Sequence, residues 1–411
     1  MKKLFAFIAM LLCISVMLCG CAELSAIADL FGFSCEHEFV WIDTADQGST
    51  PYEECTLCSY QRVEPRTLNY VPSILALLPT PMERLEPLGL DDEQKSVVLT
   101  LYYSLMSFEE TCVLNAELKL DKLDMVFDVL YMAFPEIMQT EYASTYIYTY
   151  DIVNEISFDY TMTQNEYADA VAPLTKEVKS VVGAGASMSD SEYEKYVYDY
   201  IIRNASYKIE AENSGNAYGA LISGKAKCDG YASAFSMLMQ ARGIECYLVP
   251  GVALGEQLDS IKNQLHAWNV VKIDGKYYDV DVTWGDDPLN YAYYNLSSEL
   301  SDKLHSPYAH IKDIVPECDG LALSMPTALG VEIDSKAEFA AALEKYVSEA
   351  AERGDKRLFI RYTADGANLE SALSDAVALV QVYYGQKYEL YRVGSIYVPE
   401  TFYIELEIEY M

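Results

Sequence analysis

Residues 217–232 read AYGALISGKAKCDGYA, and residues 266–284 read HAWNVVKIDGKYYDVDVTW. The first stretch carries one cysteine, Cys228, and the second carries His266 at its start and Asp281 near its end. The chain of 411 residues has only four histidines, so a histidine placed between such a cysteine and such an aspartate is unlikely to be chance. These two stretches are the part of the sequence that says most about the fold and the functional site.

Cys228 is predicted to lie at the start of a helix. Tyr231, Phe235 and Leu238 follow it at helical spacing, and Gly243 is a natural stop. Unpaired N–H groups at a helix N-terminus favour the thiolate and can also hold a developing oxyanion. A lone cysteine at a helix start is structural more often than catalytic, so its role depends on its partners.

The second stretch is predicted to form a β-hairpin around Asp274-Gly275, a strong turn signal. In the register that this turn sets, His266 faces Thr283 and Trp268 faces Asp281. His266 and Asp281 are then diagonal neighbours on one sheet face, about 7–8 Å apart at the backbone. Their side chains can close that gap to a hydrogen bond.

Asp279 lies on the same predicted face and competes with Asp281 for the role of histidine partner. It pairs with Val270, which places it too far along the strand to orient His266 easily. The opposite face is predicted to be core, and it carries Val271, Ile273, Val280, Val282 and Trp284.

A thiol, an imidazole and a carboxylate are the parts of an acyl-transfer site. In this scheme the Cys228 thiolate attacks an amide carbon, His266 delivers a proton to the leaving amine, and Asp281 holds the imidazole tautomer. This chemistry needs no cofactor. The alternative is that the three residues are structural, and that the chain is a binding or scaffolding protein without turnover.

The motifs resemble the transglutaminase-like superfamily over about residues 190–315. They are AYGAL at 217–221, CDGYA at 228–232, Gly243-Ile244, HAWN at 266–269 and YYDVDVTW at 277–284. The resemblance implies an α+β, papain-like fold in which a helix bearing the cysteine packs on an antiparallel sheet bearing the histidine and aspartate.

The same resemblance assigns the family's nucleophile to Cys228, its base to His266 and its acid to Asp281. It implies an activity among protein cross-linking, amide hydrolysis and peptide cleavage, and the fold does not choose between them. Tyr218 is a candidate for a side-chain oxyanion donor. The expected substrate is a protein or a peptide, with cell-wall peptide as one candidate.

Residues 1–21 are predicted to be a lipoprotein signal peptide. Two lysines precede an apolar run over residues 4–18, which is too short to span a bilayer comfortably. The run ends in Leu18-Cys19-Gly20-Cys21, which resembles a bacterial lipobox with Cys21 as the lipidated residue. We therefore expect a membrane anchor on the extracellular face of a bacterial cell; cleavage with release, or an uncleaved anchor, is the alternative.

Residues 22–66 are predicted to be a tether followed by a small zinc-ribbon-like segment. Its candidate ligands are Cys35, His37, Cys55 and Cys58, and Cys and His are the ligands that structural zinc prefers. Four protein ligands close a zinc site, so its role would be folding. The alternative is a Cys55–Cys58 disulfide or a pair of reduced thiols.

The flanking regions show no second catalytic cluster. Residues 67–189 are predicted to hold helices at 91–108 and 120–133 and then a strand at 145–161, with Cys112 in a helical run. The catalytic domain is predicted over 190–325, beginning with a helix capped by Ser189 and Glu192 and including a strand with Cys246. Residues 326–411 are predicted to form a small α/β domain.

The charge of the chain limits its partners. The net charge is −34, which argues against nucleic acid because a phosphate-binding surface needs clustered Lys and Arg. His305 and His310 lack a His-Glu-x-x-His frame, so a zinc hydrolase is disfavoured.

Overall fold

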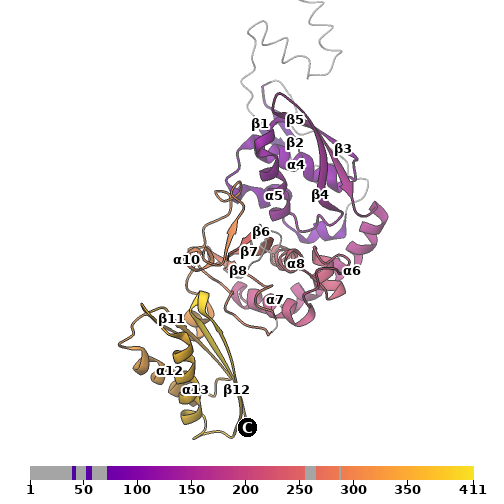
Figure 1. Ribbon diagram of the computed structural model, residues 1–411. Coiled ribbons are helices and arrows are strands. Elements are labelled where there is room, and N and C mark those ends of the chain that lie inside the picture. The colour runs from indigo at the N-terminus through magenta and orange to yellow at the C-terminus, as the bar shows by residue number, and fades with distance from the viewer. Residues whose placement is uncertain (1–38, 43–51, 58–71, 255–264, 287) are drawn as a thin grey trace, which may run out of the picture.

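The computed structural model describes residues 39–42, 52–57, 72–254, 265–286 and 288–411. Along the chain, an N-terminal part leads to a central sheet and then to a C-terminal sheet with its own helices (Figure 1). Among the described helices, none is long and apolar enough to cross a membrane.

The N-terminal part combines helices with an antiparallel sheet. Its elements are β1 (Phe39–Ile42), β2 (Tyr52–Cys55), η2 (Ser73–Leu77), α3 (Pro81–Leu85), η3 (Glu86–Leu88), α4 (Asp92–Met106), β3 (Thr111–Lys119), η4 (Leu120–Lys122), α5 (Leu123–Ala133), β4 (Thr140–Thr149) and β5 (Ile152–Tyr160). Strand β1 pairs with β2, and the larger sheet has the order β3-β5-β4. The helices predicted at 91–108 and 120–133 are confirmed as α4 and as η4 with α5.

The single strand predicted at 145–161 is wrong, because the chain reverses there. Strands β4 and β5 form a hairpin whose turn residues, Tyr150 and Asp151, have φ of 50° and 69°. A Tyr-Asp pair is not an expected turn signal, since positive φ usually calls for Gly or Asn. The helical setting predicted for Cys112 is also wrong, because that residue is buried in β3.

In the central part, helix α8 packs against a four-stranded antiparallel sheet. Its elements are α6 (Gln164–Ala184), α7 (Asp190–Asn204), η5 (Gly219–Ser223), α8 (Cys228–Ala241), β6 (Cys246–Ala253), β7 (Leu265–Ile273), β8 (Lys276–Val280), α10 (Ser298–Ser301) and β9 (His305–Pro307). The sheet order is β8-β7-β6-β9. Helix α8 contacts β6 and β7 of this sheet and also helices α6 and α7 (Figure 1).

The burial of α8 explains its composition. Every residue from Gly230 to Gln240 is buried, and a helix that is apolar all round belongs in a core. The predicted capping box at Ser189 and Glu192 is confirmed at the start of α7. One apolar cluster extends from Ile74 through α8 to Tyr294, so the N-terminal part and the central sheet share a core. Phe359, Val398 and Tyr403 of the C-terminal part also belong to this cluster.

The C-terminal part has a hydrophobic core of its own. Its elements are α11 (Met325–Leu329), β10 (Val331–Ile333), α12 (Phe339–Arg353), β11 (Arg357–Tyr362), α13 (Leu369–Tyr383), β12 (Leu390–Val398), η6 (Pro399–Thr401) and β13 (Tyr403–Tyr410). The sheet order is β10-β11-β13-β12. Buried residues of α12, α13, β11 and β13 form a separate apolar cluster.

The turn between β12 and β13 reaches the central part. Phe402, which has φ of 55°, belongs to an apolar group with Trp284 and Tyr293. Beside it, the Arg357 guanidinium forms an ion pair with the Glu405 carboxylate. The C-terminal part is therefore packed against the segment that follows β8.

Candidate active site

Cys228 is the first residue of α8, as the sequence predicts. The preceding Lys227 has an extended backbone, and its N–H donates to the Ser214 carbonyl at 2.9 Å. Gly230 is needed here, because a Cβ at that position would stand 2.3 Å from the same carbonyl oxygen. The first N–H groups of a helix have no partner within it, so the thiol lies at the positive end of α8.

His266 and Asp281 form a direct contact. Nε2 of His266 lies 2.5 Å from Oδ2 of Asp281, and the two residues are 8% and 1% exposed. The other carboxylate oxygen, Oδ1, accepts a hydrogen bond from the Trp284 N–H at 2.9 Å. Two contacts therefore fix the Asp281 carboxylate, and Nδ1 is the ring nitrogen of His266 that remains for another partner.

The hairpin has the predicted register but a shorter ladder. Ile273 pairs with Lys276 and Asn269 with Val280, around a turn in which Asp274 and Gly275 both have positive φ. The ladder ends at Val280, so the predicted pairing of His266 with Thr283 is wrong. Asp281 instead begins a turn.

Two tryptophan rings set the plane of the His266 ring. Trp284 stacks on it with centroids 4.5 Å apart and 14° between the planes. Trp268 lies 6.1 Å from it at 20°. The predicted core position of Trp284 is wrong, because the turn after β8 breaks the strand alternation and brings that ring to the histidine side.

The surroundings of His266 favour its charged form. Burial alone would lower its pKa, but the charge and hydrogen bond of Asp281, followed by a hydrogen bond and the charge of Cys228, raise the pKa of His266 to about 10. The ring is then an imidazolium at neutral pH, with a carboxylate on one side and the thiol on the other. That arrangement suits a thiolate–imidazolium pair.

Asp279, the competitor for the histidine contact, has different partners. Burial and then the Asp281 charge raise its pKa well above the usual range, while hydrogen bonds from the Trp268 and Ser301 side chains oppose the shift. One Asp279 oxygen lies 3.5 Å from Nε2 of His305. Sequence reasoning missed His305 as a neighbour of the site, since a single histidine on a short strand gives no pattern.

Cys228 and His266 both line one cleft of about 1210 Å³. Its walls come from residues 127–140, 161–170, 207–233 and the start of β7. Six carboxylate residues line it: Asp128, Glu166, Asp169, Glu210, Glu212 and Asp229. Among the described lining residues Lys227 is the one lysine or arginine, and it pairs with Asp229 at 2.7 Å. The cleft is therefore acidic.

Four tyrosines line the cleft: Tyr131, Tyr207, Tyr218 and Tyr308. Tyr218, the predicted oxyanion candidate, is one of them. Burial and then the charge of Cys228 raise the pKa of Tyr207. Burial, followed by the charges of Asp128, Asp229 and Cys228, raises the pKa of Tyr308. Tyr207 and Tyr308 thus lie within electrostatic reach of the nucleophile, and neither residue stands in a sequence pattern that would have predicted this.

Most of the remaining predicted site residues lie outside the residues that the structure describes. Cys21, Cys35, His37 and Cys58 lie outside the described residues. Cys55 ends β2, is buried, and accepts a hydrogen bond from the Leu57 N–H through its sulfur at 3.4 Å. Over the described ranges, no group of three or more His, Cys, Asp or Glu side chains could hold a metal ion. Structural zinc at these four residues stays a prediction.

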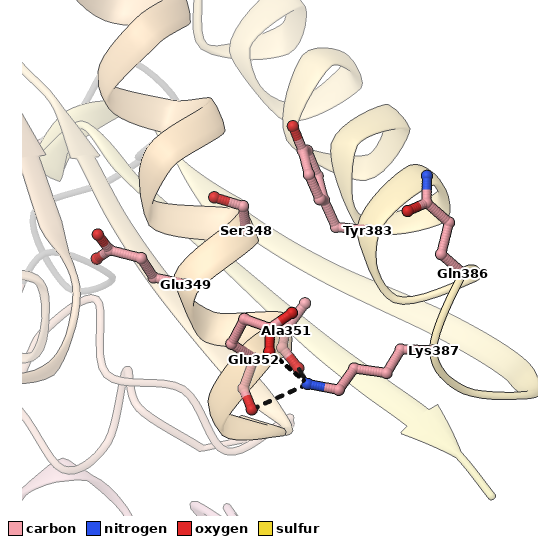
Figure 2. Close-up of a pocket in the computed structure, with 7 residues that line it drawn as sticks. All are labelled: Ser348, Glu349, Ala351, Glu352, Tyr383, Gln386 and Lys387. Atoms are coloured by element: carbon pink, nitrogen blue, oxygen red, sulfur yellow. Dashed lines mark hydrogen bonds and ion pairs between the residues drawn. The ribbon is translucent and has the colours of Figure 1, made fainter.

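A second hollow, of about 480 Å³, lies on the C-terminal part between α12 and the end of α13 (Figure 2). There Nζ of Lys387 bonds to the Glu352 carboxylate at 2.9 Å and to the Glu352 carbonyl at 3.1 Å. Its lining residues include neither cysteine nor histidine. The chemistry described above is confined to the central cleft.

Comparison with known proteins agrees with the predicted resemblance. Residues 178–282 match the family model of the Transglutaminase-like superfamily. The chain therefore contains a transglutaminase-like core, and its mixed helix and sheet content fits the predicted α+β class.

The relatives match only part of the chain. Mouse Kyphoscoliosis peptidase (Mus musculus) is 33% identical over 106 residues, which cover 24% of this chain and 16% of the relative. Human Kyphoscoliosis peptidase (Homo sapiens) is 29% identical over 150 residues, covering 34% and 22%. The chain thus spans less than a quarter of either relative. A solved TGase structure matches at 14% identity and a TM-score of 0.25, over 46% of this chain and 54% of that one.

Proposed function

We propose that this protein is a cysteine enzyme that forms a thioester with an amide substrate and then passes the acyl group to water or to an amine. Cys228 is the nucleophile, His266 the acid and base, and Asp281 the group that holds the imidazole. The substrate is a protein or a cell-wall peptide. The observation that carries the proposal is that His266 bonds to Asp281 and lines the same cleft as Cys228.

The steps follow from these groups. The Cys228 thiolate adds to the amide carbon, and the carbonyl π electrons move to oxygen. When the C–N bond breaks, the imidazolium of His266 gives its proton to the leaving amine, which leaves a thioester. His266 then takes a proton from the incoming water or amine, whose attack breaks the C–S bond, releases the acyl product and restores the thiolate–imidazolium pair. Asp281 keeps Nε2 protonated throughout.

The start of α8 supports this scheme. The N–H groups of Cys228 and Asp229 begin the helix, so they are free of helical partners and available to an oxyanion. The tryptophan rings and buried Asp281 fix the imidazole, which reduces the reorganisation needed during reaction.

The decisive experiment is activity profiling against a library of peptides and cell-wall fragments, with wild type beside Cys228→Ala. The expected result is release of ammonia or amine by wild type alone, with an acyl-enzyme adduct on Cys228 by mass spectrometry. An adduct on another residue, or equal release by both proteins, would contradict the proposal.

The second candidate is a surface scaffold that keeps the fold without turnover. Iodoacetamide separates the two functions, since an activated Cys228 should be labelled near neutral pH much faster than the buried thiols of Cys246 and Cys318. Equal and slow labelling of all three would favour the scaffold.

We also propose that Cys21 carries a lipid that anchors the protein on the extracellular face of a bacterial membrane, and that Cys35, His37, Cys55 and Cys58 bind structural zinc. A Cys21→Ala variant should lose both metabolic lipid label and membrane fractionation. The purified protein should contain zinc, and Cys58→Ser should lose it. Zinc that persists in that variant, or lipid label that persists in the other, contradicts the respective assignment.

A further inference from the structure

Behind the candidate active site lie two buried polar side chains with an unusual contact. Asp279 on β8 and His305 on β9 are 3% and 2% exposed. Oδ1 of Asp279 and Nε2 of His305 lie 3.5 Å apart, and neither atom has another hydrogen-bond partner among the described residues. Without a proton between them, these would be two acceptors facing each other in a dry site, which is strongly unfavourable.

We propose that Asp279 and His305 share one proton, held as a neutral carboxyl group donating to the imidazole, and that the pair positions His266 through Trp268. The role in positioning rests on the proposed function, whereas the shared proton does not. Asp279 and His305 touch no substrate in this scheme, so they are positioning residues.

The packing explains how the pair acts on the site. The His305 ring stacks on Trp268 with centroids 3.9 Å apart and 22° between the planes. The Trp268 side chain also donates a hydrogen bond to Asp279. Trp268 is thus held by both members of the pair, and it stacks in turn on His266 at 6.1 Å.

The surrounding charges decide where the proton lies. Burial and the Asp281 charge raise the pKa of Asp279, and burial lowers the pKa of His305 to about 3. Both directions favour the uncharged forms. The other titratable groups that act on the pair are His266 on β7, Asp302 after α10 and Cys318 after β9. An ionised Asp279 would add a second buried negative charge near Asp281.

The first test measures stability and does not depend on activity. Asp279→Asn keeps the shape, and its amide can donate to His305 permanently. Wild type must hold a proton that an unfolded Asp279 releases above about pH 3.9, so it loses stability as the pH rises, whereas the variant does not. The Tm of Asp279→Asn relative to wild type should therefore increase from about pH 4.5 to about pH 8. A Tm difference between variant and wild type that does not change over this pH range overturns the shared proton.

A second pair of variants keeps the test decisive if Asp279→Asn folds poorly. His305→Phe retains a ring against Trp268 but removes the acceptor, and Asp279→Leu removes the donor. Each single change leaves the other member of the pair unpaired, while the double variant removes both members of that contact. The double variant should have a higher Tm than either single variant. If the Tm losses of the two single variants simply add in the double variant, the shared proton is overturned.

The positioning role is tested on the full chain by the pH profile of Cys228 alkylation. Asp279→Leu, which loses its bond to Trp268, should slow alkylation by about threefold to tenfold, and Asp279→Asn should restore the wild-type midpoint and rate. Equal profiles for the two variants overturn the positioning role. If Cys228 proves unreactive in wild type, the proposed function fails while the stability tests still decide the shared proton.

Discussion

The central sheet and the C-terminal sheet bury different kinds of side chain. Around β7, β8 and β9 the molecule buries His266, Asp279, Asp281 and His305. Beneath α12 and α13 the C-terminal sheet buries apolar residues instead: Leu358, Ile360, Ile404, Leu406 and Ile408. Buried titratable groups cost folding free energy unless they are paired. The C-terminal sheet also buries Arg361 and Glu405, but each forms an ion pair with a residue of opposite charge. The difference is that the central sheet groups its buried titratable side chains in two His–Asp contacts, while the C-terminal sheet uses Arg–Glu ion pairs.

The largest expected effect is on the central cleft. Cys228→Ala should lower kcat/KM for an amide substrate by at least about 1000-fold, because no other group in the cleft replaces the thiolate. Amine release under saturating and limiting substrate measures this. Cys112→Ser, in a buried thiol of β3 away from the cleft, is the matched control and should retain activity. Residual turnover within tenfold of wild type would remove Cys228 from the mechanism.

The next effect belongs to the C-terminal sheet. Leu406→Ala removes a fully buried side chain of β13 and should lower the free energy of unfolding by about 2–5 kcal/mol. Chemical denaturation measures this. Below the unfolding transition, the alkylation rate of Cys228 should stay at the wild-type value, since Leu406 belongs to a separate core. A parallel fall in that rate would mean that the two sheets are coupled, with the ring contact between Tyr291 and Phe359 as the route.

The third prediction concerns how the contribution of His266, on the central sheet, to stability depends on pH. The folded-state pKa of His266 is raised to about 10, above its ordinary value of about 6.5. Its contribution to stability is therefore fully present below pH 6.5 and is lost as the pH rises through 10. The Tm difference between wild type and His266→Gln should shrink over this range. A difference that does not change with pH would argue against the imidazolium.

The smallest expected effect concerns the acidic lining of the cleft. Peptide amides flanked by lysine should react about threefold to tenfold faster than matched amides flanked by glutamate, and added salt should reduce the ratio. Rates at two ionic strengths measure this. Glu210→Gln with Glu212→Gln should weaken the preference, because both carboxylates line the cleft. A preference for glutamate would contradict the charge argument.

Local signals predicted the parts of the site that depend on neighbouring residues. The helix beginning at Cys228 follows from apolar spacing, and the register of β7 with β8 follows from Asp274-Gly275, whose positive φ suits that turn. The contact of His266 with Asp281 could therefore be predicted from the sequence.

The sequence could not reveal features set by distant packing. The turn at Asp281 depends on its own side chain accepting the Trp284 N–H, and that turn cancels the strand alternation. His305 reaches Asp279 only because β9 pairs with β6 at the far edge of the sheet. Tyr150 and Asp151 reverse the chain without glycine, and Asp151 alone, beside a tyrosine with positive φ, is too weak a turn signal to divide the strand pattern.

The position of α8 has a consequence for motion. The nucleophile stands at the end of a helix that is buried along almost its whole length, so the thiol cannot shift without disturbing the shared core. The amides of α8 from Tyr231 onward, which are hydrogen-bonded along the helix, should therefore exchange with deuterium only through global unfolding, at the slowest rate in the molecule. Adjustment to substrates of different shape then falls to the cleft walls and to the turn after β8.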